Sequence, residues 1–397
     1  MSNLTELKNK LSALTVFREL LEDAPLLKLY KFLHTPTLSG YAEFVSELYK
    51  ANDGNISAYI RKLCENSENV YVKAVGAKNI IPKHIKDALL YDLETLQMVA
   101  ELTPDELTTA VDYNGYLPEF AKEDINLTEL YLKRCKKIEK YGYGIYAKNH
   151  MFYIDGDGKI IPVSNPDTIR LSDLVEYERE RQIIIENTMA LLSGKAAANI
   201  LLTGDAGTGK SSSIKAVGNE LHKEGLRIIE IRKDQLRSIP KVLDELSQNP
   251  LKFILFIDDL SFLKDDDNFN ALKAVLEGSV TAKSKNVAIY ATSNRRHIIK
   301  ETFSDREGDD VHRNDTMQEL ISLSERFGLH ITFSKPNKDT YLKIVHHLAE
   351  ENGLNMNLNE LDLLAERFAL ERGNRSARLA RQFVDKLLSE KGDNNVL

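Results

Sequence analysis

The sequence predicts an α/β protein with three αβα layers: a five-stranded parallel sheet between helices, a mostly helical N-terminal domain and a C-terminal helical lid. From Leu171 onward, short apolar runs alternate with helical patterns, which is typical of a parallel sheet with helices on both faces. The run Lys252–Ile257 is apolar after its first residue, as expected for a strand covered on both sides. Before residue 140, leucines recur at helical spacing.

Composition limits the classes of protein to consider. The 397 residues suffice for two or three domains, and the net charge of −7 favours neither nucleic acid nor anionic membrane as a partner. The two cysteines, Cys64 and Cys135, are far apart, which argues for a reducing compartment and against a zinc site. No apolar run approaches the roughly 20 residues of a membrane span. We therefore expect a cytoplasmic protein without a membrane anchor.

Residues 1–140 are expected to form a helical domain. Its first segment shows apolar residues at spacings of three and four, which predict one amphipathic helix: Leu4, Leu7, Leu11, Leu14 and Phe17. No catalytic constellation is evident in this region. We expect it to bind a partner rather than to carry chemistry.

Residues 141–170 are expected to be a linker that contains a β-hairpin. The runs His150–Ile154 and Lys159–Val163 are strand-like, and Asp155–Gly158 between them carries the Asp-Gly pairs of a tight turn. The acidic turn lacks the ligand spacing of a calcium-binding EF-hand loop. A hairpin is therefore the better interpretation.

Residues 171–335 are expected to form the α/β domain, and residues 336–397 the lid. The five predicted strands are 199–203, 226–231, 252–257, 287–292 and 329–333. Three helices follow at about 338–352, 358–372 and 375–390, with Gly353 and Gly373 at the ends of the first two. The string Asn337-Lys338-Asp339 is similar to the guanine-reading N-K-x-D motif, but its fourth residue is Thr340. We expect Asn337 or Asp339 to be a helix N-cap instead.

A complete phosphate-binding motif lies between the first strand and its helix. The pattern G-x-x-x-x-G-K-[ST] predicts a P-loop, in which backbone N–H groups and a helix N-terminus surround a phosphate chain. Lys210 would reach the β- and γ-phosphates, and the Ser211 hydroxyl would hold Mg²⁺. The predicted nucleotide-binding residues are Gly204, Asp205, Ala206, Gly207, Thr208, Gly209, Lys210, Ser211 and Ser212.

Two carboxylates follow the apolar strand 252–257. A P-loop needs an acidic partner for its metal, and Asp258 stands at that position, at the end of a hydrophobic strand. Asp258 is therefore predicted to hold Mg²⁺ together with Ser211. Asp259 is the candidate general base that orients the attacking water.

The order of these motifs resembles the AAA+ ATPases over about residues 171–390. After the P-loop and the acidic strand end come Ala291-Thr292-Ser293-Asn294, Ser324-Glu325-Arg326-Phe327-Gly328 and Gly373-Asn374-Arg375-Ser376-Ala377-Arg378. The strings IDDLSF, LKAVLEG, YATSNRRHI and LSERFGL resemble an uncharacterised bacterial group of predicted AAA+ ATPases with an N-terminal helical extension. The Ser-Glu-Arg-Phe-Gly string is also similar to the replication initiator DnaA.

The resemblance implies ATP and Mg²⁺ as cofactors and roles for five further residues. Asn294 matches the sensor 1 position, which orients the lytic water. Arg326 matches the arginine finger, which enters the site of a neighbouring subunit, and Arg378 matches sensor 2. Val175 and Tyr177 lie in the segment that packs on adenine in the family.

Two departures from the family pattern affect the function that we expect. Asp259 stands where most members have Glu, and the shorter side chain implies slower hydrolysis. The segment after 226–231 lacks the aromatic–apolar–glycine loop of protein-threading unfoldases. The leading hypothesis is an ATPase that assembles into a ring or arc, hydrolyses ATP at subunit interfaces, and remodels or loads a partner macromolecule held by residues 1–165. The alternative is an ATP-gated DNA-binding switch of the helicase-loader kind, and a small-molecule kinase is the third.

Overall fold

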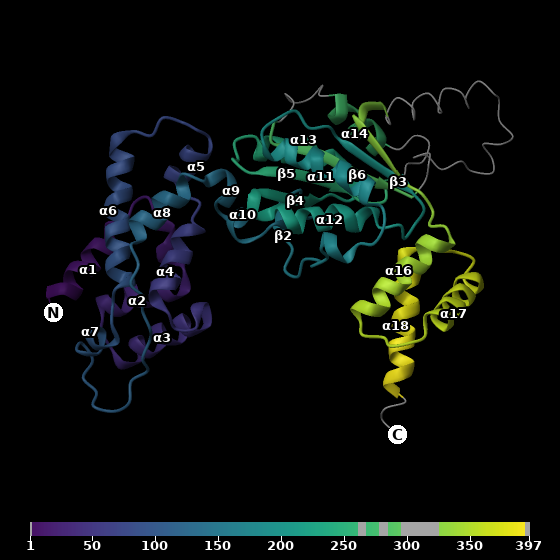
Figure 1. Ribbon diagram of the computed structural model, residues 1–397. Helices are drawn as coiled ribbons and strands as arrows, with labels where there is room; N and C mark the ends of the chain where they lie inside the picture. Colours follow the sequence, from purple (N-terminus) through teal and green to yellow (C-terminus); the bar gives the residue numbers. More distant parts are fainter. Residues whose placement is uncertain (1, 261–266, 278–284, 295–324, 394–397) are drawn as a thin grey trace. The chain divides into compact units, whose positions relative to one another are not determined.

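The computed structural model describes residues 2–260, 267–277, 285–294 and 325–393 (Figure 1). The chain folds into two compact units. One comprises Met1–Lys148 together with the short segment Gln248–Leu251, and the other comprises Asn149–Ser247 together with Lys252–Leu397.

The first unit is helical throughout its regular structure. Its elements are α1 Ser2–Ser12, the 3₁₀-helix η1 Arg18–Glu22, α2 Ala24–His34, α3 Leu38–Asn52, α4 Ile56–Glu65, α5 Val70–Gly76, α6 Lys83–Ala100, α7 Pro104–Thr108, α8 Leu127–Cys135, α9 Ile138–Tyr141 and α10 Ile145–Lys148. One apolar core runs through them, with Phe17, Tyr41, Leu93 and Leu96 among its fully buried members. Within the described residues, no helix combines the length and apolar character that crossing a bilayer requires.

The prediction of one amphipathic helix up to Phe17 was wrong in length. Helix α1 ends at Ser12, although Leu14 and Phe17 are still buried. The physical reason is the buried Asp92 of α6, whose Oδ2 accepts the backbone N–H groups of Thr15 and Phe17 at 3.0 and 2.9 Å. These bonds take the N–H groups that a continuing helix would use internally.

The second unit is built on a seven-stranded sheet with the order β2-β1-β4-β5-β6-β3-β7. Its strands are β1 Met151–Ile154, β2 Ile160–Pro162, β3 Ile200–Gly204, β4 Leu226–Glu230, β5 Lys252–Ile257, β6 Val287–Ser293 and β7 Leu329–Phe333. All neighbours are parallel except β1 and β2. The strands after Leu171 lie within one or two residues of their predicted positions.

The expected five-stranded sheet is therefore corrected to seven strands. The hairpin itself is present, with Tyr153 opposite Ile161, and the Asp155 carboxylate accepts the N–H groups of Asp157 and Lys159 in its turn. The hairpin also adds to the sheet, because Met151–Tyr153 pair in parallel with Ile228–Glu230 of β4. An edge strand offers a row of unpaired N–H and C=O groups, and β1 satisfies those of β4.

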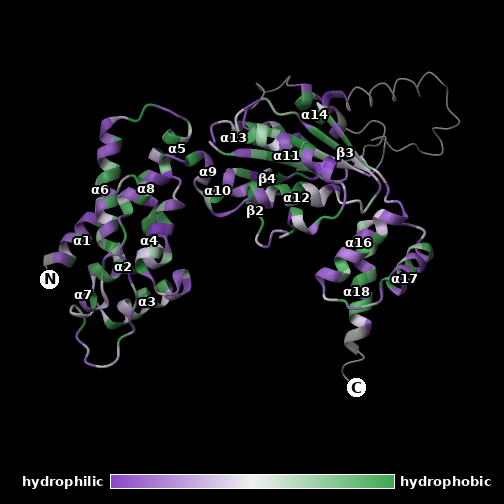
Figure 2. Cartoon of the chain, in the orientation of Figure 1, coloured by the Kyte–Doolittle hydropathy of each residue, from purple (hydrophilic) through white to green (hydrophobic). Residues whose placement is uncertain are grey.

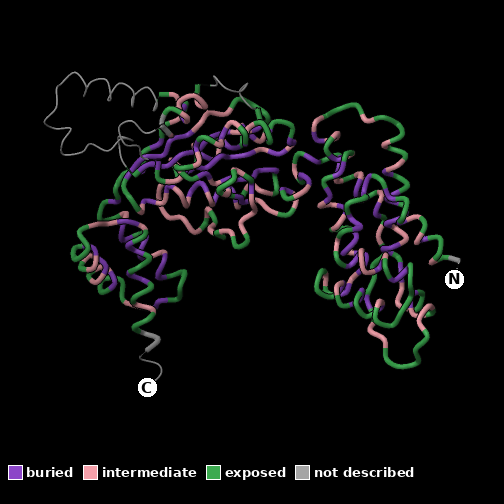
Figure 3. The backbone as a smooth tube through the Cα atoms, turned by 180° about the vertical axis from the view of Figure 1, so that it is seen from behind, coloured by how far each residue is buried: buried purple, intermediate pink, exposed green. Residues whose placement is uncertain are grey.

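Helices cover both faces of the sheet. Ile184 of α11 (Glu178–Leu192) and Ile214 of α12 (Lys210–Leu221) share a core with Leu202 and Phe256. The alternate side chains, such as Leu255, are also fully buried, and α13 (Ile239–Leu246) lies on the other side of β4 and β5 from α12 in Figure 1. The strands are largely hydrophobic in Figure 2 and buried in Figure 3. The remaining elements are the 3₁₀-helices η2 Leu171–Asp173, η3 His222–Glu224 and η4 Lys233–Ser238, and α14 Asp267–Glu277.

Three helices form the C-terminal lid: α16 Lys338–Glu351, α17 Leu358–Glu371 and α18 Ala377–Asp393. Gly353 and Gly373 follow the first two with φ of +65° and +66°, which confirms the predicted helix ends. The Asn337 side chain accepts the N–H of Thr340 over 2.8 Å. Asn337 is thus an N-cap, as predicted, and not part of a guanine-reading motif.

Candidate nucleotide-binding site

The P-loop connects β3 to α12 and turns sharply at its glycines. At Gly204, φ is +141° and an added Cβ would lie 2.0 Å from the Phe333 carbonyl oxygen, so no larger residue fits there. Gly207 and Gly209 also have positive φ, +80° and +93°. The Thr208 hydroxyl donates to the Asp205 carbonyl over 2.9 Å and closes the loop. The result is a concave backbone at the N-terminus of α12, the arrangement that binds phosphate.

Lys210 lies inside this loop and is only 4% exposed. Its Nζ donates to the carbonyls of Gly204 and Asp205, both at 2.8 Å, and to Asn294 Oδ1 at 3.1 Å. Burial lowers the pKa of Lys210, and the nearby carboxylates oppose that shift. The ammonium is therefore held where a phosphate chain in the loop would meet it.

Ser211 and Asp258 meet at the end of β5. The Ser211 hydroxyl donates to Asp258 Oδ1 over 2.6 Å, and Thr292 Oγ1 donates to the same oxygen over 2.5 Å. Hydroxyl and carboxylate oxygens are the ligands that Mg²⁺ prefers. Nowhere in the described parts of the chain do three or more His, Cys, Asp or Glu side chains form a metal cluster. Since Mg²⁺ uses few protein ligands beside phosphate and water, this donor pair fits Mg²⁺.

Asp259 and Asn294 lie side by side at the ends of β5 and β6. The Asn294 Nδ2 donates to Asp259 Oδ1 over 2.7 Å, while its Oδ1 accepts from Lys210. Asn294 thus links the P-loop lysine to the second carboxylate. The two residues that were predicted to handle the attacking water are brought together by the parallel strands β5 and β6.

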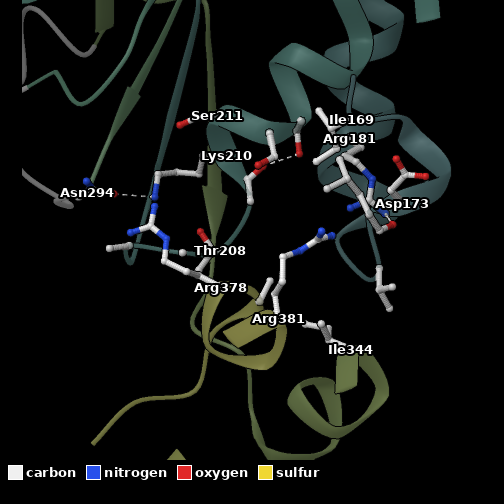
Figure 4. Close-up of a pocket in the computed structure, with 18 of the residues that line it drawn as sticks. Ile169, Asp173, Arg181, Thr208, Lys210, Ser211, Asn294, Ile344, Arg378 and Arg381 are labelled. Carbon is white, nitrogen blue, oxygen red and sulfur yellow. Dashed lines mark hydrogen bonds between the residues drawn. The ribbon is translucent and has the colours of Figure 1, made fainter. Parts of the chain in front are cut away.

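A cavity of about 520 Å³ opens over these groups (Figure 4). Its walls come from the P-loop, the acidic strand end, the segment before α11 and the lid. Arg378 reaches it from the lid on the side of Lys210 and Asn294, and Arg381 reaches it on the side of Asp173 and Ile344. The apolar part of the wall comprises Ile169, Leu174, Val175, Ile344 and Leu348.

The lid touches the P-loop directly. The N–H of Arg378 donates to the Gly207 carbonyl over 3.4 Å, and a Cβ added at Gly207 would lie 3.0 Å from Ser376 Oγ. Lys343 of α16 pairs with Glu176 at 3.0 Å. The segment that carries Val175 and the P-loop are therefore both in contact with lid residues.

Four predicted residues are not among those lining the cavity: Gly204, Asp205, Tyr177 and Arg326. The Tyr177 hydroxyl donates to the Ser334 carbonyl over 2.5 Å, and its ring packs on Phe333 with the centroids 5.1 Å apart. Arg326 pairs with Glu277 of α14 at 2.6 Å. Ser324 of the same motif is not among the described residues.

Sequence reasoning missed several residues of this region, among them Ile169, Arg181, Thr292, Ile344 and Arg381. Arg181 is 7% exposed and donates to the Leu174 carbonyl over 2.9 Å, which supports the apolar wall. Arg381 follows Arg378 by three residues on a helix, so the sequence spacing could have predicted that both side chains lie on the same face. Thr292 stands inside the quoted Ala-Thr-Ser-Asn string, but a threonine in a strand carries no signal of its own.

The fold and the site define a P-loop protein of the AAA+ type, with a parallel α/β domain and a helical lid over one cavity. Residues 147–391 match the family described as "Protein of unknown function (DUF815)", and the chain belongs to that family. The resemblance to an uncharacterised group of AAA+ proteins is thereby confirmed.

The comparison with solved structures finds the Thermotoga maritima RuvB Holliday junction branch migration motor. It is 13% identical, with 56% of this chain and 64% of that chain covered, and a TM-score of 0.39. Two further structures, each of a variant of the same RuvB, are similar at 13% and 12% identity with the same TM-score. The chain thus spans less than two thirds of the RuvB structures, and a likeness this distant says nothing about activity. The comparison with curated proteins gave no match. The similarity to DnaA stays limited to one short string.

Proposed function

We propose that this protein binds ATP with Mg²⁺ in the cavity beneath the lid and hydrolyses it. The observation that carries the proposal is the meeting of a buried P-loop lysine, two carboxylates and a lid arginine around one cavity. Lys210 and Arg378 would contact the phosphates, and Ser211 with Asp258 would hold Mg²⁺. The metal would neutralise charge on the β- and γ-phosphates.

Asp259 and Asn294 would handle the attacking water. The Asp259 carboxylate would accept a proton from the water, and the Asn294 amide would orient the water and this carboxylate. In the present conformation the Asn294 amide is bonded to Lys210 and Asp259. A phosphate chain that draws the ammonium of Lys210 away would free Asn294 Oδ1, while Nδ2 would keep its bond to Asp259.

The base of the nucleotide would lie against the apolar part of the wall. The cavity volume of about 520 Å³ is within the usual range of small-molecule pockets. Val175 and Ile344 would contact adenine from opposite walls, one from the segment before α11 and one from the lid. Tyr177 would support this segment through its bond to Ser334 rather than touch the base.

Arg326 would act in the site of a neighbouring subunit. It does not line the cavity of its own chain, and the ion pair with Glu277 holds it on the α14 side. An arginine supplied in this way is worth about 10³–10⁵ in rate in related enzymes. We therefore propose a ring or arc of subunits, in which residues 1–165 hold a partner macromolecule that the α/β domain and lid remodel.

The experiment that tests this proposal is steady-state ATP hydrolysis per chain as a function of protein concentration, with Mg²⁺. We expect the rate to rise with concentration, because each site is completed by a neighbour, and Lys210→Ala should abolish it. A flat, very slow rate with ATP still bound would contradict assembly and favour the nucleotide-gated switch. Salt-dependent retention of DNA in ATP but not in ADP would then identify that switch.

A further inference from the structure

The Thr292 side chain contacts both carboxylate residues of the site at once. It lies near the end of β6 and is 2% exposed. Its hydroxyl donates to Asp258 Oδ1 over 2.5 Å and accepts the backbone N–H of Asp259 over 3.0 Å. A hydroxyl has one proton to donate, and here it goes to Asp258 while the oxygen accepts from Asp259, so the two bonds fix the orientation of the hydroxyl.

The first bond orients the Asp258 carboxylate. Oδ1 accepts from Thr292, from Ser211 at 2.6 Å and from the Asp259 N–H at 3.1 Å. Among the described residues, no donor contacts the other oxygen, Oδ2. The carboxylate is therefore held by one oxygen and presents the second to a cation or its water shell.

The second bond fixes the backbone of Asp259. This residue has φ of +53°, a left-handed conformation that is uncommon for residues other than glycine, although aspartate adopts it more readily than most. Thr292 restrains this backbone twice, because its carbonyl also accepts the N–H of Leu260 over 2.7 Å. An aspartate side chain is short, so the backbone largely decides where its carboxylate lies. With this backbone, Asp259 Oδ1 lies 2.7 Å from the Asn294 amide.

We propose that Thr292 is the positioning residue for both carboxylates. It orients Asp258 toward the metal and holds Asp259 in the left-handed conformation that lets a short carboxylate reach Asn294. It acts through these two residues and is not among those lining the cavity. The inference rests on the proposed function, since it assumes that Asp258 serves a metal bound with nucleotide.

The test measures binding of a fluorescent, non-hydrolysable ATP analogue to the full-length chain, titrated with Mg²⁺ and repeated in EDTA. Thr292→Val keeps the shape of the side chain and removes the hydroxyl. We expect the Mg²⁺ concentration for half-maximal effect to rise about tenfold, the lower end for lost partners of metal ligands. Binding in EDTA should stay unchanged, because Thr292 does not touch the nucleotide. Thr292→Ser should restore the wild-type requirement.

Thr188→Val is the matched control. Thr188 is also fully buried in this unit, and its hydroxyl bonds to the Ile184 carbonyl and the Tyr290 hydroxyl rather than to either carboxylate. It should leave the Mg²⁺ requirement unchanged. If Thr292→Val does not fold, Thr292→Ala against Thr292→Ser makes the same comparison.

The outcomes separate this inference from the proposed function. A Thr292→Val chain with the Mg²⁺ requirement of the wild type, or a serine variant as impaired as the valine variant, overturns the role of Thr292 alone. A wild-type chain that binds no ATP analogue overturns the proposed function and this inference together.

Discussion

The helical unit and the α/β unit each contain a carboxylate that accepts several hydrogen bonds, and the two carboxylates serve different purposes. Asp92 in the helical unit is fully buried and accepts two backbone N–H groups, those of Thr15 and Phe17. Asp258 in the α/β unit is half-buried, accepts two side-chain hydroxyls and borders a cavity. Each carboxylate has one oxygen that no donor contacts among the described residues. Oδ1 of Asp92 is buried in the helical core, whereas Asp258 lines a cavity, where Oδ2 can meet a ligand. Burial of a charge alone therefore does not identify a site, and its surroundings must be known.

The largest expected effect tests whether the chemistry of the α/β unit needs a second chain. Arg326→Ala should lower ATP turnover about 10³–10⁵-fold while ATP binding is retained, because the arginine acts on the γ-phosphate of a neighbour. Turnover and equilibrium binding are measured side by side. Arg367→Ala is the control, since Arg367 is an exposed arginine of α17 paired with Glu371. Wild-type turnover in Arg326→Ala would remove the reason for assembly.

The second largest effect tests whether Asp259 beside the cavity takes part in ATP hydrolysis rather than only stabilising the fold. Asp259→Asn should reduce turnover about 10²–10⁴-fold, the usual contribution of a general base, and leave ATP bound. Single-turnover kinetics measures the step directly. Asp244→Asn on α13 changes the charge equally at an exposed position. If both variants turn over ATP alike, Asp259 is not the base.

The third prediction concerns Asp92, the buried carboxylate of the helical unit. Asp92→Ala leaves the N–H groups of Thr15 and Phe17 without their acceptor, so the free energy of unfolding should fall by about 2 kcal/mol. Urea denaturation measures this loss. The affinity for ATP should not change. A loss of ATP binding in a chain that is still folded would contradict the separation of stability from chemistry.

The pH dependence of Asp92 gives the sign of its electrostatic contribution. Burial raises the pKa of Asp92 above its ordinary value of 3.8. The folded state therefore binds its proton more tightly than the unfolded state, and this stabilisation is complete below pH 3.8 and lost as pH rises through the folded pKa. Asp92→Asn should thus gain stability relative to the wild type as pH rises above 3.8. The same change at exposed Asp87 on α6 corrects for net charge.

The smallest effect separates the two lid arginines. Arg381 is exposed and lies on the side of the cavity away from Lys210, so Arg381→Ala should weaken ADP and ATP about equally, by about fivefold or 1 kcal/mol. Arg378→Ala should weaken ATP more than ADP, because Arg378 lies on the side of Lys210. Calorimetric titration with both nucleotides measures the ratios. If Arg381→Ala lowered the affinity for ATP but not the affinity for ADP, Arg381 rather than Arg378 would be the residue that contacts the γ-phosphate.

Much of the α/β fold could be read from local patterns, and some of the site could not. The strands 252–257 and 329–333 were predicted at their observed bounds. The first is an apolar run buried in the sheet, and the second alternates apolar with polar residues, as a strand with one covered face does. The hairpin was recognised from its turn, yet its pairing with β4 was missed. Nothing local in Met151–Ile154 says which distant strand edge it will complete. Helix α1 was predicted too long for the same reason, since Asp92 lies far along the chain from Leu14.

The sequence by itself determined the phosphate-binding motif and the helix ends of the lid. Gly204–Ser211 are contiguous, and the bond from Thr208 to Asp205 and the start of α12 at Lys210 depend on neighbours within a few residues. The Asn337 cap has the same short range. Only the tertiary structure decided which side chains surround the loop: Arg381 and Ile344 come from the lid, and Thr292 from a neighbouring strand. The physical reason is that hydrogen bonds and packing act over a few ångströms, so segments distant in sequence reveal their contacts only after folding.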